Sequence, residues 1–334
     1  MGAEQHPGQV RAGLLYAIGA YGLWGLVPLY FFTVKACPAH ELVAHRIVWS
    51  ALLLAVVVAF LGRWREVITA FRTRKTLLML LASAYLVAGN WYVYVWCATH
   101  DQITQASLGY FILPLVNVIA GLVLFGDRLR FAQAAALAIA TAGVIYMAVS
   151  LGQFPWIGIV LAVSFALYGI VRKVVPVDGV IGLTVESFLL APVAVVLLVV
   201  WDLTDGLAFA HVSRELDALI AFSGVVTTVP LVCFAQAVRK VSLVTIGVLQ
   251  YLSPTLQLVV AVSVFGEPFT RQHQISFGLI WLGLAVYAVD TVRAAARRQL
   301  MRPAPEPVPE PLDGGVPLTD SQLMALDGRR RSDL

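Results

Sequence analysis

Four ionisable side chains stand inside long apolar stretches of this sequence, where charges are rare. Glu41, His45 and Arg46 occur together in "ELVAHRIVWS", and Glu186 occurs in "GLTVESFLLAP". Within a membrane such side chains are costly to bury and are candidates for function by default. Arg46 could instead extend its long side chain to the nearer surface. The side chain of Glu186 is shorter, which favours a cavity-facing role and makes it the candidate for carrying a coupling proton.

Arg46 and Glu186 are not expected to pair, although their charges are opposite. Arg46 lies towards the outer end of its apolar stretch and Glu186 towards the inner end of its own. At 1.5 Å rise per helical residue, their backbones differ in depth by roughly 13 Å. Each is therefore expected to meet water, solute or a local polar partner.

Further polar and aromatic residues lie at mid-depth in the same kind of stretch. An amide or hydroxyl there can simply join two helices by a hydrogen bond, which is the alternative interpretation. Aromatic rings with a few amides and hydroxyls suit a small amphipathic organic solute, whereas an ion filter needs rings of carbonyls or carboxylates. The predicted cavity residues are His45, Arg46, Asn90, Trp91, Tyr94, Tyr110, Asn117, Tyr168, Glu186, Thr227, Thr228, Gln250 and Tyr251.

Motifs for catalysis or metal binding are absent from the sequence. It contains no phosphate-binding loop, no HExxH and no nucleophile elbow. Its cysteines, Cys37, Cys97 and Cys233, lack the spacing of metal ligands. We therefore expect no cofactor, no bound metal and no enzymatic activity.

The elements that carry these residues are predicted from composition. The chain is 60% hydrophobic and 13% charged, far from the balance of a soluble domain. Its apolar blocks have the length that crosses a bilayer as a helix, and a backbone in lipid must satisfy its own hydrogen bonds. We predict an all-α integral membrane protein with ten spans, at about 12–33, 41–61, 76–97, 104–125, 131–149, 154–171, 180–200, 216–237, 243–265 and 274–293.

The positive charges of the chain lie almost entirely on one side of these spans. Of 23 Lys and Arg residues, only Lys35, Arg214 and Arg271 fall in loops of the other side, and Arg46 lies within a span. This asymmetry is typical of cytoplasmic loops and predicts that both termini are cytoplasmic. The net charge of +4 is thereby explained by topology, so no nucleic-acid partner is expected.

The chain repeats itself at an offset of 140 residues. "SLGYFILPLVNVIAGLVLFGD" begins at Ser107 and "GVLQYLSPTLQLVVAVSVFGE" at Gly247, and both share a proline, an amide and a Phe-Gly-acid ending. A unit of five spans is odd in number, so the second copy must cross in the opposite sense. We predict a cytoplasmic N-terminus at 1–11, inverted five-helix repeats at 12–150 and 151–293, and a disordered cytoplasmic tail at 294–334.

Each copy places a proline near the centre of a span. Pro114 and Pro254 remove a backbone donor and leave the carbonyls of Tyr110 and Gln250 without their usual partners. Inside lipid this is tolerated where a neighbouring helix, a hydroxyl or water substitutes. A symmetric pair of kinks beside a central cavity is expected, and a kink that serves packing alone is the alternative.

Several stretches resemble one known family. "AHRIVWS", "GNWYVYVW", "ASLGYFILPLVN", "SFALYGIVRK", "VTTVPLVCF" and "GVLQYLSPTLQ" resemble the RarD branch of the EamA permeases, in the drug/metabolite transporter superfamily. The resemblance covers about residues 10–295. It implies a multi-pass transporter of the bacterial inner membrane, without indicating its substrate.

The leading hypothesis is a secondary transporter that moves a small organic solute or drug-like metabolite by alternating access. Proton coupling, the direction of transport and the oligomeric state, monomer or dimer, are left open. The alternative is a membrane-embedded accessory or sensor protein that binds a ligand without transport. The expected partners are the solute and the lipid bilayer.

Overall fold

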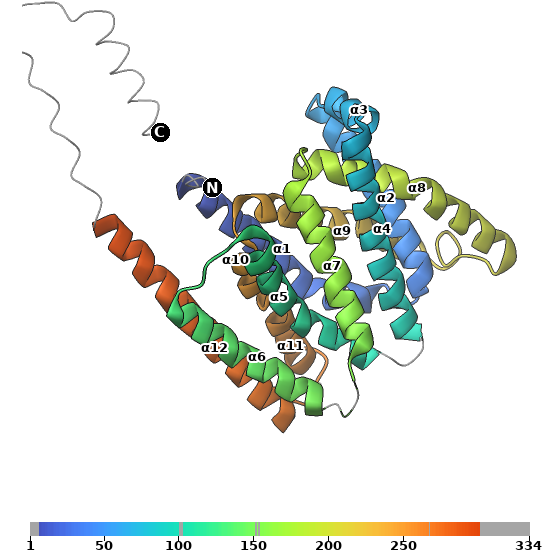
Figure 1. The fold of residues 1–334 in the computed structure, drawn as a ribbon. Coiled ribbons are helices and arrows are strands. Elements are labelled where there is room, and N and C mark those ends of the chain that lie inside the picture. Colours follow the sequence, from blue (N-terminus) through green and yellow to red (C-terminus); the bar gives the residue numbers. More distant parts are fainter. Residues whose placement is uncertain (1–6, 100–102, 151, 153, 267, 301–334) are drawn as a thin grey trace, which may run out of the picture. The chain divides into compact units, whose positions relative to one another are not determined.

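The regular elements that the structure describes are all α-helices. The computed structural model describes residues 7–99, 103–150, 152, 154–266 and 268–300 (Figure 1). The helices are α1 (Pro7–Thr33), α2 (Ala39–Phe60), α3 (Trp64–Arg72), α4 (Arg74–Thr99), α5 (Ile103–Phe125), α6 (Phe131–Ser150), α7 (Trp156–Val174), α8 (Gly179–Thr204), α9 (Arg214–Lys240), α10 (Leu243–Gln250), α11 (Leu252–Ser263) and α12 (Arg271–Leu300). The chain divides into two compact units, Met1–Asp290 and Thr291–Leu334, and the helix bundle described below is the first.

Most of these helices are long and apolar enough to cross a bilayer. Nine such stretches occur within the described residues, and α5 adds the shorter apolar segment Gly109–Phe125. An all-helical membrane protein is therefore the fold class, whereas the count of ten spans stays a prediction. The short helix α3 lies outside the predicted blocks, between α2 and α4. It buries Val67 and Ala70 and exposes most of its other residues.

The predicted span at 243–265 is interrupted at Tyr251, where α10 ends and α11 begins. Pro254 cannot donate to the Gln250 carbonyl, so this turn lacks one backbone hydrogen bond. The Tyr251 amide instead donates to Val248 O at 3.3 Å, which is a tighter turn. α5 continues through Pro114 without interruption, so a kink there stays a prediction.

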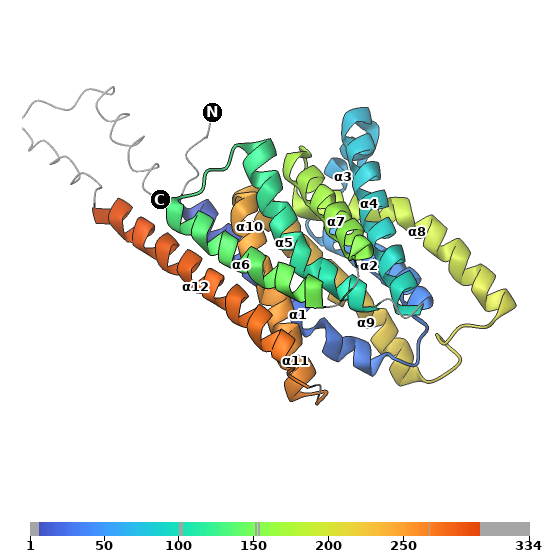
Figure 2. The ribbon, with the colours of Figure 1, turned by 60° about the horizontal axis from the view of Figure 1, so that its bottom comes forward.

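The centre of the bundle is filled by aromatic and aliphatic side chains from helices far apart in sequence. Tyr21, Tyr168 and Phe234 are fully buried there, with the rings of Tyr168 and Phe234 stacked at 6.0 Å. α1 packs on α9, α5 on α7, and α2 on both α8 and α9 (Figure 2). Functional residues on these helices are therefore held by long-range packing.

α6 and α12 lie side by side in both ribbon views (Figures 1 and 2). A Cβ atom at Gly143 would lie 2.8 Å from the Ser276 carbonyl oxygen, and one at Gly283 would lie 2.6 Å from that of Ala136. Glycine is the residue that permits so close an approach of two helix backbones.

The predicted termini fall only partly in the described residues. α1 begins at Pro7, within the predicted N-terminal segment, and residues 1–6 lie outside the description. Residues 294–300 belong to α12 rather than to the predicted tail, and the rest of that tail, 301–334, lies outside the described residues.

Candidate functional site

A cavity of about 540 Å³ lies in the middle of the bundle and is lined by residues of eight helices. It extends from the mid-bundle residues Tyr21 and Leu161 to Phe32 and Phe265, near the ends of α1 and α11. The volume is within the range of sites that enclose drug-sized ligands. The rings of Phe32 and Phe265 approach to 5.3 Å at this end.

Many of the predicted cavity residues line this space. They are Arg46, Asn90, Trp91, Tyr94, Tyr110, Thr227 and Gln250, together with the predicted kink residue Pro254. The sequence did not single out other lining residues, among them Trp24, Phe31, Phe165, Ser253 and Gln257. The repeat could have identified Gln257 as a candidate, because Gln257 is the amide that matches Asn117.

Arg46 projects from α2 into the cavity wall. Its Nε donates to the Thr227 hydroxyl oxygen at 2.8 Å, which ties α2 to α9. Its guanidinium lies over the rings of Trp91, at 5.0 Å, and Phe31, at 5.7 Å. A guanidinium stacks on aromatic faces through its positive charge and its planar shape. The contact with Thr227 leaves the terminal nitrogens of Arg46 available to a ligand.

The amides of the site join pairs of helices near the cavity. Asn117 Nδ2 donates to Gln250 Oε1 at 2.7 Å, which connects α5 with α10. Asn90 Nδ2 donates to the Leu161 carbonyl and to Ser164 Oγ, both at 2.9 Å. These bonds hold the Asn90 and Gln250 side chains in place, and each amide keeps further hydrogen-bonding capacity.

Glu41 and His45 form a contact outside the cavity lining. Glu41 accepts hydrogen bonds from the backbone amides of Ala208 and Phe209, at 2.9 and 3.0 Å. His45 Nε2 lies 3.5 Å from Glu41 Oε1, and its ring lies 4.7 Å from that of Phe209. The pair therefore fastens the α8–α9 connection to α2, which is a structural task.

Glu186 is buried with Arg172 and Ser83 and forms no ion pair with Arg46. Arg172 Nη1 lies 3.4 Å from Glu186 Oε1, and the Ser83 hydroxyl donates to the same oxygen. Arg172 is 0% and Glu186 1% exposed. Sequence reasoning counted Arg172 only as a cytoplasmic charge, because it stands at the end of its apolar block. The only sequence feature that pointed to this pair was the charge of Glu186 inside an apolar stretch, since a buried carboxylate needs a partner.

The remaining predicted residues lie beside the cavity rather than on its wall. The hydroxyls of Tyr168 and Thr228 are buried without a hydrogen-bond partner among the described residues. Tyr251 donates to the Phe111 carbonyl at 3.5 Å, and Asn117 reaches the cavity only through Gln250.

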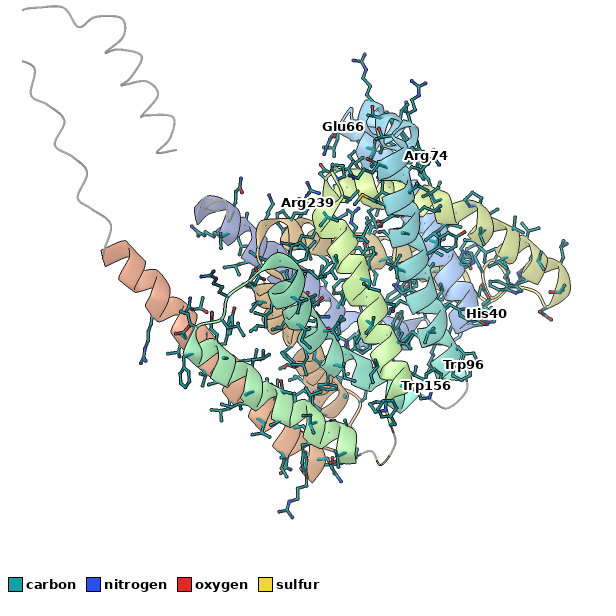
Figure 3. The ribbon with its side chains drawn as sticks, in the orientation of Figure 1. His40, Glu66, Arg74, Trp96, Trp156 and Arg239 are labelled. Carbon is teal, nitrogen blue, oxygen red and sulfur yellow. The ribbon has the colours of Figure 1, made fainter. Side chains whose placement is uncertain are left out.

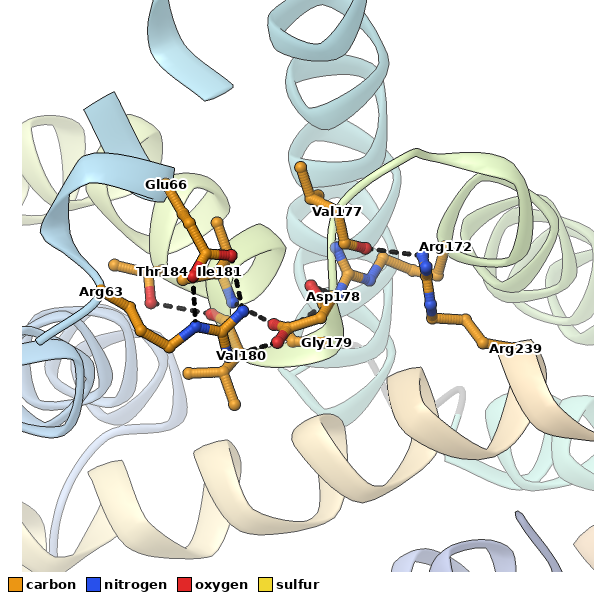
Figure 4. A network of polar contacts seen from close by, with 10 residues as sticks. All are labelled: Arg63, Glu66, Arg172, Val177, Asp178, Gly179, Val180, Ile181, Thr184 and Arg239. Atoms are coloured by element: carbon orange, nitrogen blue, oxygen red, sulfur yellow. Dashed lines mark hydrogen bonds and ion pairs between the residues drawn. The ribbon is translucent and has the colours of Figure 1, made fainter. Parts of the chain in front are cut away.

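Basic side chains bind backbone carbonyls at the opposite end of the bundle (Figure 4). Arg239 Nη1 donates to the carbonyls of Val175 and Val177 at 2.7 and 2.6 Å. Lys173 Nζ donates to the carbonyls of Val238 and Val241 at 2.7 and 2.8 Å. These bonds fasten α7 and the α7–α8 turn to α9. We call this end of the bundle, where Lys173 and Arg239 lie, the basic end.

The α7–α8 turn is also held by charges on its outer side (Figure 4). Arg63 pairs with Asp178 and donates two hydrogen bonds to Glu66, each at 2.6 Å. These bonds raise the pKa of Arg63 and hold the pKa of Glu66 below its ordinary value. Within the described residues, no three His, Cys, Asp or Glu side chains are placed to hold a metal ion.

Comparison with known proteins places the chain among membrane transporters. Residues 155–289 match the model of the EamA-like transporter family. The chain is 41% identical to an uncharacterized transporter of Vibrio cholerae, over 86% of this chain and 96% of that protein. It is 36% identical to the protein RarD of Escherichia coli K12, over 86% and 98% of the two chains. A solved crystal structure superposes with a TM-score of 0.66 at 18% identity, over 84% of this chain and 99% of its own, and shows a shared fold.

Proposed function

The chain belongs to the EamA-like transporter family, in its RarD-like branch, and on that premise we propose that it moves a small organic solute across the bacterial inner membrane by alternating access. The observation that carries the proposal is the inequality of the two ends of the bundle. The cavity of about 540 Å³ extends to one end, at Phe32 and Phe265, whereas Lys173 and Arg239 at the basic end bind backbone carbonyls and do not line it.

An inverted repeat is supported by reciprocal contacts between α6 and α12. Gly143 meets Ser276, and Gly283 meets Ala136. Adding 140 to the α6 residue of each contact gives the α12 residue of the other contact, since 143 becomes 283 and 136 becomes 276. Reciprocal contacts of this kind are the signature of a two-fold axis. The contacts run in opposite directions along the two helices, so this axis would lie across them, in the membrane plane.

The two repeats differ in state at equivalent positions. Arg46 lines the open cavity, whereas its equivalent at the offset of 140, Glu186, is buried with Arg172. Exchange of the two environments would close the cavity at Arg46 and open one at Glu186, which is the alternation that inverted repeats provide. The present structure then corresponds to the state open at the end opposite the basic end.

Orientation follows from the charges at the two ends. Figure 3 shows Glu66, Arg74 and Arg239 towards one end of the bundle, and Trp96 and Trp156 towards the other. Basic residues favour the cytoplasmic side and tryptophans favour the interface. We therefore assign the basic end to the cytoplasm and the open end to the outside.

Glu186 is the group best placed to couple transport to protons. Its Oε2 atom and the Nε atom of Arg172 are buried without a close hydrogen-bond partner in the described structure, and the Tyr168 hydroxyl faces Glu186. Buried polar atoms of this kind are costly. Opening the basic end would hydrate them and give Glu186 a route to exchange a proton with the cytoplasm.

The proposal is tested by the accessibility of one equivalent pair of residues. Phe265 lines the open end, and its equivalent Phe125 packs under Lys173 at the basic end. In a background lacking the native cysteines, Phe265→Cys should react with an impermeant maleimide in right-side-out vesicles. Phe125→Cys should react slowly in inside-out vesicles and faster after a bismaleimide joins Phe32→Cys to Phe265→Cys.

The cross-link should raise the labelling of Phe125→Cys because closing one end favours opening of the other. A cross-linked protein whose Phe125→Cys labels no faster than before would contradict alternating access. Solute binding without flux in proteoliposomes would favour the accessory or sensor protein instead.

A further inference from the structure

Arg46 is the only charged side chain among the described residues that line the cavity. Its guanidinium has five N–H donors, and the Nε donor is used by Thr227. Nε is the inner donor of the group, so the two terminal nitrogens remain as a planar fork. Such a fork matches the two oxygens of a carboxylate.

No carboxylate of the described chain lies within ion-pair distance of Arg46. Glu41, one turn earlier on α2, accepts its hydrogen bonds from the α8–α9 connection. Glu186 is paired with Arg172. The titratable groups that face Arg46 are the phenols of Tyr30, Tyr94 and Tyr110. A positive charge in a largely apolar cavity is costly unless an anion accompanies it. The described chain supplies no such anion to Arg46, so a bound solute would have to supply it.

The rest of the cavity wall is aromatic around this charge. Trp24 and Phe165 meet edge to face at 5.7 Å, and Tyr94 and Tyr110 at 6.3 Å. Polar side chains, among them Gln250, also belong to the lining. An aromatic or similarly bulky apolar body would be enclosed by these rings, with its negative group at Arg46.

We infer that Arg46 is the anion receptor of the cavity and that the solute class is organic anions in which a carboxylate is joined to an aromatic body. This inference rests on the proposed transport function, because it names the solute of the same cavity. A cationic solute is disfavoured by the charge of Arg46, and a neutral solute would leave that charge uncompensated.

Three matched probes of one ring system test the inference on the purified full chain in nanodiscs. They are indole-3-acetate, which is an anion, indole-3-acetamide, which is its neutral isostere, and tryptamine, which is a cation. Calorimetric titration should show the anion binding most tightly. Arg46→Gln should weaken the binding of the anion by on the order of 10–100-fold, because hydrogen bonds to a charged group contribute a free energy of this size. The same variant should leave the binding of the amide nearly unchanged.

Two further variants separate recognition from folding. Arg46→Lys keeps the charge without the fork and should retain part of the affinity for indole-3-acetate. Arg271→Gln removes an exposed arginine that is not among the lining residues and should bind as the wild type does. Equal affinity of the wild type for the anion and the amide, tighter binding of tryptamine, or an unchanged anion affinity in Arg46→Gln would each overturn the inference.

Flux in proteoliposomes distinguishes failure of this inference from failure of the transport proposal. Uptake of the amide or the amine in preference to the anion would refute the solute class and leave the transporter in place. Arg46-dependent binding of indole-3-acetate without any flux would refute transport and leave the anion site in place. Arg46-dependent binding and uptake of the anion would support both.

Discussion

Replacing Gly182 with alanine should destabilise the bundle, although this change in a helix interior ordinarily stabilises it. Alanine is favoured over glycine by about 0.8–1.0 kcal/mol at such a position. At Gly182, however, a Cβ atom would lie 1.9 Å from Nη1 and 2.8 Å from Cζ of Arg172. Ordinary contact begins at 3.4 Å, so the guanidinium would have to move by about 1.5 Å.

That displacement separates Arg172 from the groups that compensate its charge. Its Nη1 lies 3.4 Å from Glu186 Oε1, and its Nη2 donates to the Gly179 carbonyl at 2.9 Å. Arg172 is completely buried, so its guanidinium cannot exchange these partners for bulk water without leaving the core. Breaking a buried ion pair by the loss of one partner costs about 3–5 kcal/mol. After the gain in helix propensity, Gly182→Ala should lower the unfolding free energy by about 2–4 kcal/mol.

The unfolding free energy can be measured by titration with sodium dodecyl sulfate in mixed micelles. Gly89→Ala is the matched control, because a Cβ atom at Gly89 meets nothing within 4 Å. This control should be neutral or slightly stabilising. Arg172→Ala removes the group that collides, so the double variant should be about as unstable as Arg172→Ala alone. Additive costs in the double variant, or a Gly182→Ala protein as stable as the control, would refute the reasoning.

Three other predictions concern the pseudo-symmetry, the buried acid and the outer charge cluster. Gly143→Val and Gly283→Val should each destabilise the protein by about 1–3 kcal/mol through overpacking. The double variant should lose less than the sum of the two, since both changes disturb one interface. Additive losses would argue against a shared interface. Glu186→Gln leaves Arg172 without its anion and should be less stable, but it should still fold in detergent while losing at least tenfold in solute flux and any response to a pH gradient. Full gradient-dependent flux would exclude Glu186 from coupling. The depressed pKa of Glu66 means that its pairing stabilises the protein above the ordinary carboxyl pKa of about 4.3 and that this contribution is lost as the pH falls below it. The melting temperatures of the wild type and Glu66→Gln should therefore differ at pH 7 and converge as the pH falls through the lowered pKa of Glu66, and a constant difference would contradict this.

The fold class and the family could both be predicted from the sequence. Apolar blocks of bilayer length can form only helices in lipid, because their backbones must satisfy their own hydrogen bonds. The break at Tyr251 also had a local cause in Pro254. The matching stretches were sufficient to predict the EamA family, which the comparisons confirmed.

The candidate site was predictable only as a set of residue types. Deep amides and aromatics pointed to Asn90, Trp91 and Gln250, which line the cavity. The same criterion selected Thr228 and Tyr168, which do not. The direction of a side chain from its helix depends on how that helix is rotated against its neighbours, and apolar sequence on all sides of a span leaves this rotation undetermined.

Tertiary structure alone decided which charges meet. By depth, the sequence separated Arg46 from Glu186, and the two do lie in different environments. The partner of Glu186 is Arg172, which the short α7–α8 turn and the missing side chain of Gly182 bring against it. Arg46 is left facing a cavity whose walls come from helices hundreds of residues apart. A charge pair depends on distances of a few ångströms, and such distances arise only when distant helices pack together.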